Sequence, residues 1–223
     1  MKRTPSPAET RQALLEAAGA VFAEHGYRDT TVRDICQRAG ANVAAVNYHF
    51  GDKEHLYLEV LRHSQGKAAR KFPMDLGLDA QARPEARLGA FVRSFLFRIF
   101  DSGPTAWMGK LMSMEMINPS RALDTLVEER IRPMANQLRE IVLEILGPKA
   151  SLEAARLCGF SIVSQCLFYV HCRSVVLRLF PEQKFEPGDI EHLAEHITQF
   201  SLAALKDFNS KPKKLSPATK PKK

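Results

Sequence analysis

Apolar residues recur at helical spacing along almost the whole chain. Between residues 9 and 208, no run alternates apolar and polar positions in the manner of a half-buried strand, and no internal repeat occurs. The stretch from about Thr10 to His25 is typical, because its apolar residues fall on one helix face. These residues are Leu14, Ala18, Val21 and Phe22. The pattern therefore predicts an all-α protein.

Helix caps and chain breakers divide this pattern into about nine helices. Residues suited to N-caps begin several helices, and glycine or proline separates the others. The N-cap candidates are Thr31, Asn42, Asp52 and Ser151. Pro133 is expected to break or kink the seventh helix. The predicted helices span about residues 10–25, 32–39, 43–49, 53–71, 84–101, 104–117, 119–146, 151–175 and 188–207.

The stretch TTVRDICQRAGANVAAVNYHF, residues 30–50, combines a capped helix, a glycine-centred turn and a second capped helix. This arrangement is typical of a helix-turn-helix, in which the second helix enters the DNA major groove and its first residues meet base edges. Val43, Ala44 and Ala45 let the backbone come close to the bases, and their methyl groups can touch thymine methyls. The sequence thus predicts a base-reading helix over residues 43–49.

Polar side chains flank this predicted helix on both sides. Tyr48 and His49 lie at its rim, where they can donate hydrogen bonds to phosphates, and Lys53 adds a positive charge on the next helix. Thr31 and Arg33, at the start of the preceding helix, face the phosphates on the other side. A competing interpretation is a pair of ordinary short helices with Tyr48 half-buried, because short helix pairs are common.

Residues 10–62 closely resemble the N-terminal domain of TetR/AcrR-family regulators. The matching features are F-x-x-x-G-Y at the end of the first helix, TTVRDI, the A-G of the turn, and Y-x-F-x-x-K-E-x-L. The candidate DNA-binding set therefore also includes Val32 and Asn42. The family usually has a tyrosine where this chain has Asn47, and the aromatic residue here is Tyr48, so either side chain is a candidate for the DNA contact.

The rest of the chain is similar to the C-terminal domain of the CecR-type branch of this family. NVAAVNYHFGDKEHLYLEV and the block SMEMINPSRALDTLVEERIRPMANQLREIV, residues 113–142, carry the similarity. It implies a homodimeric transcriptional regulator that binds a palindromic double-stranded DNA operator and is by default a repressor released by a small-molecule effector. The domains expected are a helix-turn-helix domain over 10–71 and a helical effector and dimerisation domain over 72–208. A disordered start over 1–9 precedes them.

Methionine and aromatic residues in the C-terminal half are consistent with a cavity for an apolar or aromatic effector. Methionine fills irregular spaces and tolerates varied partners, and such a cavity needs only a few polar groups. The same residues can equally form an ordinary core. The candidates are Phe91, Phe95, Trp107, Met108, Met112, Glu115 and Gln165.

The helix predicted over 151–175 is apolar almost all the way round, so it needs cover on every side. One helical domain covers one side, and a second copy of the chain can cover the other. The alternative is the central helix of a single bundle. The candidates for a homodimer interface are Phe160, Val163, Leu167, Leu193, Ile197 and Phe200.

The net charge of +7 is largely a property of the end of the chain. Residues 209–223 carry six lysines and no acid, which leaves the other 208 residues at only +1. Charge is therefore weak support for DNA binding by the body of the protein. The tail is rich in proline, serine and lysine and is expected to be disordered, either as a solubilising end or as an accessory arm on phosphates.

Other classes of protein are disfavoured. The first residues lack the apolar core of a secretory signal, and the most apolar stretch, 157–170, is too short for a membrane span. The four cysteines form no C-x-x-C pair. We therefore expect a cytoplasmic protein with reduced thiols and no membrane partner.

The chain also lacks the usual marks of catalysis. The H-x-x-E-H pattern at residues 192–196 has no later carboxylate to complete a zinc set, so we expect no metal and no cofactor. No nucleophile–base pair or phosphate-binding loop indicates an enzyme. The alternative to a ligand-switched regulator is a DNA-binding protein of the same fold with a structural or protein-interaction role and no small-molecule switch.

Overall fold

The computed structural model describes residues 5–79, 81–101 and 107–210, and within these ranges the chain contains helices and no strands. The all-α prediction is confirmed. The lysine-rich tail, predicted to be disordered, lies from residue 211 onward outside the described residues. The first three residues of the helix predicted over 104–117 lie outside them as well.

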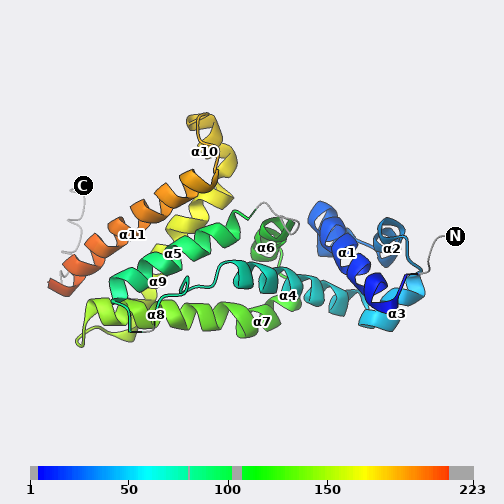
Figure 1. Cartoon of the computed structure of the whole chain (residues 1–223), viewed down its shortest axis with the longest axis horizontal. Coiled ribbons are helices and arrows are strands. Elements are labelled where there is room, and N and C mark those ends of the chain that lie inside the picture. The colour runs from blue at the N-terminus through cyan, green and yellow to red at the C-terminus, as the bar shows by residue number, and fades with distance from the viewer. Residues whose placement is uncertain (1–4, 80, 102–106, 211–223) are drawn as a thin grey trace, which may run out of the picture.

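The helices follow the predicted order, with changes at their ends (Figure 1). Helices α2 and α3 form the helix-turn-helix, α4 leads out of it, and the later helices form the C-terminal half. The bounds are α1 Pro7–Asp29, α2 Val32–Ala39, α3 Val43–Phe50, α4 Lys53–Lys71, α5 Pro84–Ile99, α6 Trp107–Ile117, α7 Ala122–Leu126, the π-helical segment η1 Val127–Ile131, α8 Arg132–Leu146, α9 Leu152–His171, α10 Arg173–Leu179 and α11 Pro187–Ser210.

Helix α1 begins earlier than the apolar pattern indicated. The Ser6 hydroxyl accepts a hydrogen bond from the Glu9 N–H at 3.2 Å, and the Glu9 carboxylate accepts one from the Ser6 N–H at 2.6 Å. This reciprocal capping box starts the helix at Pro7. The expectation of disorder over residues 1–9 is therefore wrong for residues 5–9. Near the other end of α1, Gly26 has a φ of 79°, which interrupts the helical backbone where the prediction ended.

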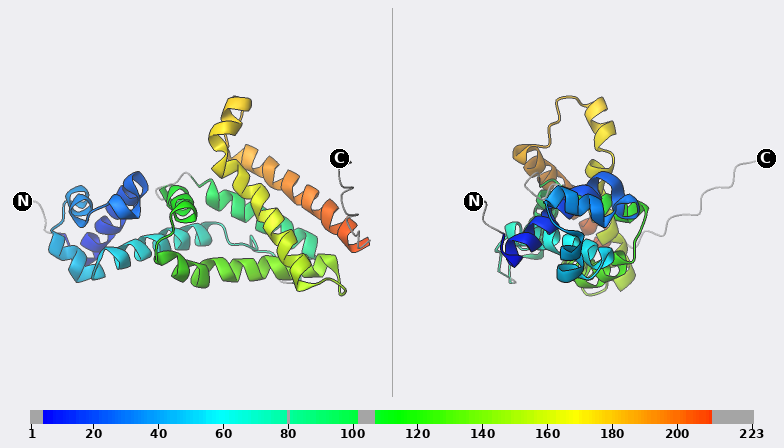
Figure 2. Two further views of the ribbon diagram at one scale, coloured as in Figure 1. Left: turned by 180° about the vertical axis from the view of Figure 1, so that it is seen from behind. Right: turned by 90° about the vertical axis from the view of Figure 1, so that its right-hand side faces the viewer.

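Two hydrophobic cores follow one another along the molecule. One core joins α1, α2, α3 and α4 and extends to Leu111 of α6 and Leu126 of α7. The other lies among α5, α8, α9 and α11. Figure 2 shows α1, α2 and α3 at one end of the molecule and α11 at the other, with α4 running between them. Helices α4, α6 and α7 thus connect the helix-turn-helix to the C-terminal half.

The helix predicted over 119–146 is interrupted just before Pro133, as expected. Proline has no N–H to donate to the carbonyl four residues earlier. The backbone instead widens to the π-helical segment η1, in which the Arg132 N–H donates to the Val127 carbonyl, five residues back. Helix α8 then continues to Leu146. Segments of this kind are frequent at functional sites, and η1 borders the cavity described below.

The helix predicted over 151–175 ends at His171, and α10 follows it at a bend of 71°. Among the described residues, no helix taken singly combines the length and apolar character needed to cross a membrane. Only α9 and α10 taken together, across their bend, reach that length and composition.

Candidate DNA-binding surface and effector cavity

Short-range hydrogen bonds set the geometry of the helix-turn-helix. The Thr31 hydroxyl accepts a hydrogen bond from the Asp34 N–H at 3.2 Å and donates one to the Asp34 carboxylate at 2.6 Å. The bonds that the Thr31 hydroxyl and the Thr31 N–H donate to the Asp34 carboxylate lower the pKa of Asp34. Gly40 adopts the left-handed conformation, with φ 63°, that ends α2. The Asn42 side chain then caps α3 by accepting from the Ala44 N–H at 3.0 Å.

Helix α3 presents one face to solvent and buries the other. Val43 is 45% exposed and Tyr48 is 81% exposed, whereas Val46 and Phe50 lie in the core. Tyr48 is therefore not the half-buried side chain of the competing interpretation. The exposed face combines an apolar start with a phenol at its end.

Other residues of the predicted DNA-binding set are also accessible to solvent. Thr31, Arg33, Ala44 and Asn47 are exposed. His49 is half-buried, and its ring meets the Tyr48 ring edge-on at a centroid distance of 4.8 Å. Asn47 and Tyr48 are both accessible, so neither is excluded from a DNA contact.

Two predicted contact residues are partly withdrawn from this surface. Val32 and Ala45 are half-buried and pack against the core of α1–α4. Both lie on faces turned toward α1, because α2 and α3 must each bury an apolar side. We expected the Ala45 methyl group to contact a base. In the structure, this half-buried side chain packs against the core instead.

Lys53 makes different contacts from those expected. Its ammonium donates hydrogen bonds to the carbonyls of Tyr27 and Thr30, each at 2.9 Å, and lies over the Tyr27 ring at 4.5 Å from the centroid. A cation at the C-terminal end of a helix satisfies carbonyls that lack helical partners. In this structure Lys53 therefore joins α4 to the end of α1 rather than extending toward solvent as a phosphate ligand.

A cavity of about 460 Å³ lies in the C-terminal half among α4, α5, α6, η1, α8 and α9. Its lining is mostly apolar and includes the predicted pocket residues Phe95 and Met112. Volume and apolar lining are both typical of a small-molecule site. Sequence reasoning missed the contributions of α4 and α8. The missed lining residues include Gln65, Ala69, Met74, Arg98, Ile99 and Met134.

The remaining predicted pocket residues lie elsewhere. Phe91 is buried in the core between α5 and its neighbours. Trp107 packs on Gly19 of α1, where an added Cβ would lie 2.3 Å from the indole Cζ2. Gln165 donates to the Ser201 hydroxyl at 3.3 Å and does not line the cavity. The Met108 side chain lies outside the described residues.

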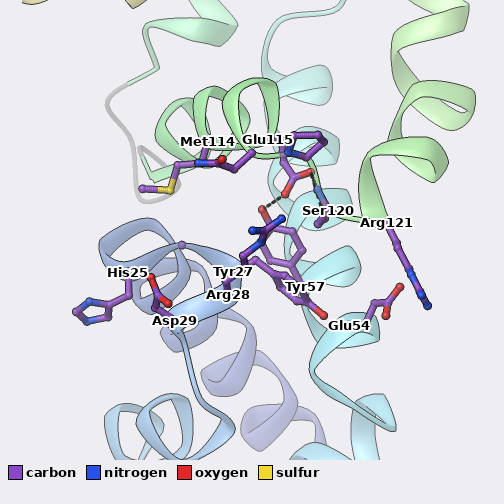
Figure 3. A pocket seen from close by; sticks show the side chains of 13 residues that line it. His25, Tyr27, Arg28, Asp29, Glu54, Tyr57, Met114, Glu115, Ser120 and Arg121 are labelled. Atoms are coloured by element: carbon purple, nitrogen blue, oxygen red, sulfur yellow. Dashed lines mark hydrogen bonds between the residues drawn. The ribbon is translucent and has the colours of Figure 1, made fainter.

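Glu115, also predicted to line the effector pocket, instead joins the two halves of the protein. It is only 2% exposed, and its carboxylate accepts hydrogen bonds from the Tyr57 hydroxyl at 2.7 Å and from the Ser120 N–H at 3.0 Å. Figure 3 shows this junction, where Tyr57 of α4 points at Glu115 of α6. Burial, and then the neighbouring carboxylate, raise the pKa of Tyr57. A cleft of about 500 Å³, lined by Tyr27, Glu115 and others, opens beside the junction.

The predicted dimer residues separate into three groups. Phe160 of α9 and Phe200 of α11 are 57% and 60% exposed. Leu193 and Ile197 lie in the core of the C-terminal half, so their assignment to an interface is wrong for this arrangement. Val163 and Leu167 line the cavity. Further exposed large apolar side chains on the same two helices are Leu157, Phe168 and Phe208.

In the parts of the chain that the structure describes, no group of three or more His, Cys, Asp or Glu residues is placed to hold a metal ion. His192 and His196 of the H-x-x-E-H pattern are exposed on α11.

Two protein families match the chain. Residues 14–60 match the family described as bacterial regulatory proteins, tetR family. Residues 84–205 match the C-terminal domain of the HTH-type transcriptional dual regulator CecR. The first match contains α2 and α3, and the second contains the helices from α5 through most of α11.

Characterised relatives agree with these matches. The HTH-type transcriptional dual regulator CecR of Shigella flexneri is 28% identical over 201 residues, which is 80% of this chain and 85% of that protein. The HTH-type transcriptional repressor AcnR of Corynebacterium glutamicum (strain ATCC 13032) is 43% identical over 63 residues, which is 28% of this chain and 34% of AcnR. The HTH-type transcriptional repressor KstR2 of Mycobacterium tuberculosis (strain ATCC 25618) is 42% identical over 86 residues, 38% of this chain and 42% of KstR2.

A solved structure shares the fold. The TetR family transcriptional regulator PfmR from Thermus thermophilus superposes with a TM-score of 0.62 at 21% sequence identity, and the match covers 90% of this chain and 97% of that one. The arrangement of a helix-turn-helix followed by a helical C-terminal half is therefore one found in known transcriptional regulators.

Proposed function

This chain is a TetR-family transcriptional regulator with a CecR-type C-terminal domain, and we propose that it binds a palindromic DNA operator as a homodimer and is released by a small-molecule effector. AcnR and KstR2 are named repressors, and CecR is named a dual regulator. We therefore propose repression as the default action, exerted on chromosomal DNA in the cytoplasm.

The exposed face of α3 carries the proposal of sequence-specific DNA binding. Val43 and Ala44 project from the first turn, and Tyr48 projects one turn later from the same helix. Apolar groups at the start of a recognition helix can contact thymine methyls, and a phenol can donate to a phosphate or a base edge. The capped ends of α2 and α3 hold this face rigidly, which lowers the entropic cost of docking.

The exposed apolar face of α9 and α11 supports a homodimer. Phe160 and Phe200 lie on helices whose other faces are buried in the protomer, so a second copy can cover them. An interface that places this face of each copy against the other is self-complementary and forms a closed dimer. Two copies of α3 would then reach major-groove faces about 34–36 Å apart or a multiple of that distance, as an inverted repeat requires.

Helix α6 supports coupling between the cavity and the DNA-binding end. Gly109, Met112 and Met116 line the cavity, whereas Trp107 packs on α1 and Glu115 bonds to α4. A ligand that fits the cavity better in one placement of α6 shifts the population toward that placement. The same shift moves the contacts that position α1 and α4, and so changes the spacing of the two reading helices.

Selection from a genomic DNA pool tests the proposal. The protein truncated after Phe208 is used at near-physiological salt, because the lysine tail adds salt-sensitive, sequence-blind affinity. We expect enrichment of one inverted repeat. Val43→Asp should weaken binding to that repeat by about tenfold or more, since it removes an apolar contact and adds a negative charge near phosphates.

Leu78→Asp is the matched control, because Leu78 is also an exposed apolar residue but lies beyond α4. It should bind like wild type. Equal binding by Val43→Asp and wild type would remove α3 as the reading helix. If a folded, dimeric protein enriches no sequence, specific regulation is excluded. If the protein binds its repeat but shows no thermal shift with a broad ligand panel, the alternative without a small-molecule switch is favoured.

A further inference from the structure

We propose that the effector cavity binds an apolar molecule bearing one carboxylate, and that Arg98 is the residue that binds this carboxylate. The proposal rests on the proposed function only in taking this cavity to be the effector site. To the proposed function it adds the charge of the ligand and the side chain of the protein that binds the charged group.

The cavity walls predict the body of the ligand. Most of the lining comes from thioether, aromatic and branched aliphatic side chains, which favour an apolar surface without prescribing a single shape. They include Met74, Phe95, Ile99, Met112, Met134 and Leu167. An uncharged polar molecule would lose its hydration here and regain few hydrogen bonds.

Arg98 sets the charge of the ligand. It lies in the last turn of α5 and lines the cavity. Its Nε donates to the Phe72 carbonyl at 2.7 Å, which anchors the guanidinium and fixes its plane. Among the described residues, that bond is the one hydrogen bond of the Arg98 side chain, and no carboxylate pairs with it. The terminal nitrogens thus keep donors for a ligand.

Glu129, the acid that lines the cavity, and Asp101, which follows Arg98 in the sequence, already have partners. Glu129 accepts a hydrogen bond from the Arg62 Nε at 2.9 Å. Asp101, three residues after Arg98, pairs with Lys71 at 2.6 Å. Burial lowers the pKa of Arg98, which shows that its charge is poorly solvated. A half-buried cation without a counter-ion is a strong site for an anion.

The shape of guanidinium favours a carboxylate. Its fork of N–H donors matches the two oxygens of a carboxylate and gives charge-assisted hydrogen bonds. Arg130, exposed at the cavity edge, adds a second positive charge beside Glu129, which is already paired with Arg62. A ligand with an ammonium group would face both arginines and is disfavoured.

Direct binding to the full-length protein tests the proposal without involving DNA. The probes are octanoate, laurate and 2-naphthoate, each paired with the primary alcohol and the amine of the same skeleton. Isothermal titration measures affinity. The fluorescence of Trp107, the single tryptophan of the chain, reports occupancy because α6 both carries this residue and lines the cavity.

We expect at least one acid to bind about tenfold or more tightly than its alcohol, and the amine to bind weakest. This comparison uses wild-type protein and is independent of the folding of any variant. Alcohols that bind as tightly as their acids would overturn the proposal, as would the failure of every acid to bind.

The substitution Arg98→Met tests whether Arg98 binds the carboxylate. Methionine keeps an apolar side chain of similar length, so the acid should lose its advantage over the alcohol. Arg93→Met is the matched control, because Arg93 lies on the same helix, pairs with Glu191 of α11 and is remote from this cavity. It should keep the preference. Arg98→Lys, which keeps the charge but loses the fork, should retain part of it.

The result separates this inference from the proposed function. If an uncharged ligand binds the cavity and releases the operator, the regulator stands and the carboxylate assignment falls. If an acid binds through Arg98 but no DNA sequence is enriched, the carboxylate site stands and the regulatory role falls. An unchanged acid preference in folded Arg98→Met would show that another group binds the carboxylate.

Discussion

Removing the hydroxyl of Tyr57 tests the junction between α4 and α6. This hydroxyl donates to the buried Glu115 carboxylate at 2.7 Å. Phenylalanine at position 57 preserves the ring and its edge-to-face contact with Phe22, at a centroid distance of 4.7 Å. The substitution therefore isolates one hydrogen bond to a carboxylate that has little access to water.

The expected cost follows from that geometry. A hydrogen bond to a charged partner contributes about 1.5–3 kcal/mol to stability. Its loss costs an amount in the upper part of this range when the charged partner stays buried. Glu115 keeps its bonds from the Ser120 N–H and hydroxyl, at 3.0 and 3.1 Å. These remaining donors prevent the larger penalty of an isolated buried charge. Tyr57→Phe should thus lower the free energy of unfolding by about 1.5–3 kcal/mol.

Urea unfolding at a fixed protein concentration measures this loss, because the proposed dimer would make apparent stability depend on concentration. Tyr48→Phe is the control. It removes a hydroxyl from a side chain that is 81% exposed and should change the free energy by less than about 0.5 kcal/mol. Equal, small losses in the two variants would refute the reasoning and mean that Glu115 does not hold the Tyr57 hydroxyl in solution.

The pH dependence gives a second measure of the same contact. Burial and the Glu115 carboxylate raise the pKa of Tyr57 above its ordinary value of 10.0. The folded protein therefore holds this proton more tightly than the unfolded chain does. The stabilisation is fully present below about pH 10 and is lost as pH rises above it. Wild type should lose stability between pH 10 and 11 more steeply than Tyr57→Phe.

Two further substitutions test packing and assembly. Gly19→Ala should lower the thermal midpoint through a loss of about 1–3 kcal/mol, because the new methyl group would meet the Trp107 indole, whereas Gly66→Ala on α4 should be neutral or stabilising by up to about 1 kcal/mol. A Gly19→Ala protein as stable as wild type would show that α6 does not pack on α1. Phe160→Asp should convert the dimer to a folded monomer in analytical ultracentrifugation, and an unchanged dimer would place the interface elsewhere.

Local signals explain why the helix-turn-helix was predictable from the sequence. The Thr31–Asp34 capping box, the left-handed Gly40 and the Asn42 cap each depend on residues within three or four positions. No distant contact is needed to place these helix ends. Contacts across a longer separation were not predictable in the same way. A lysine in the first turn of a helix can face either phosphates or carbonyls, and the position of α1 gives Lys53 the carbonyls.

The face that α9 turns inward also depends on the whole fold. This helix is apolar all round, so its sequence does not distinguish the side that meets the cavity from the side that meets a partner. Val163 and Leu167 are four residues apart and line the cavity, while Phe160 lies on the exposed side. The register is set by α5 and α8, which pack against α9 from one side. Val163 and Leu167, first assigned to the interface, thus line the cavity, whereas Gln165, first assigned to the cavity, does not.

Helix α6 shows why a methionine-rich segment was only partly assigned to the cavity. Trp107, Leu111 and Glu115 recur every four residues and face the DNA-binding end, whereas Met112 and Met116 face the cavity. Both faces of α6 are largely apolar, so the sequence predicts that this helix is buried. It does not indicate that the two faces meet different parts of the protein. Helix α6 packs on the core of the DNA-binding end through Leu111 and Trp107, and it lines the cavity with Met112 and Met116. In the proposed function, α6 is therefore the element through which an occupied cavity would alter the reading helices.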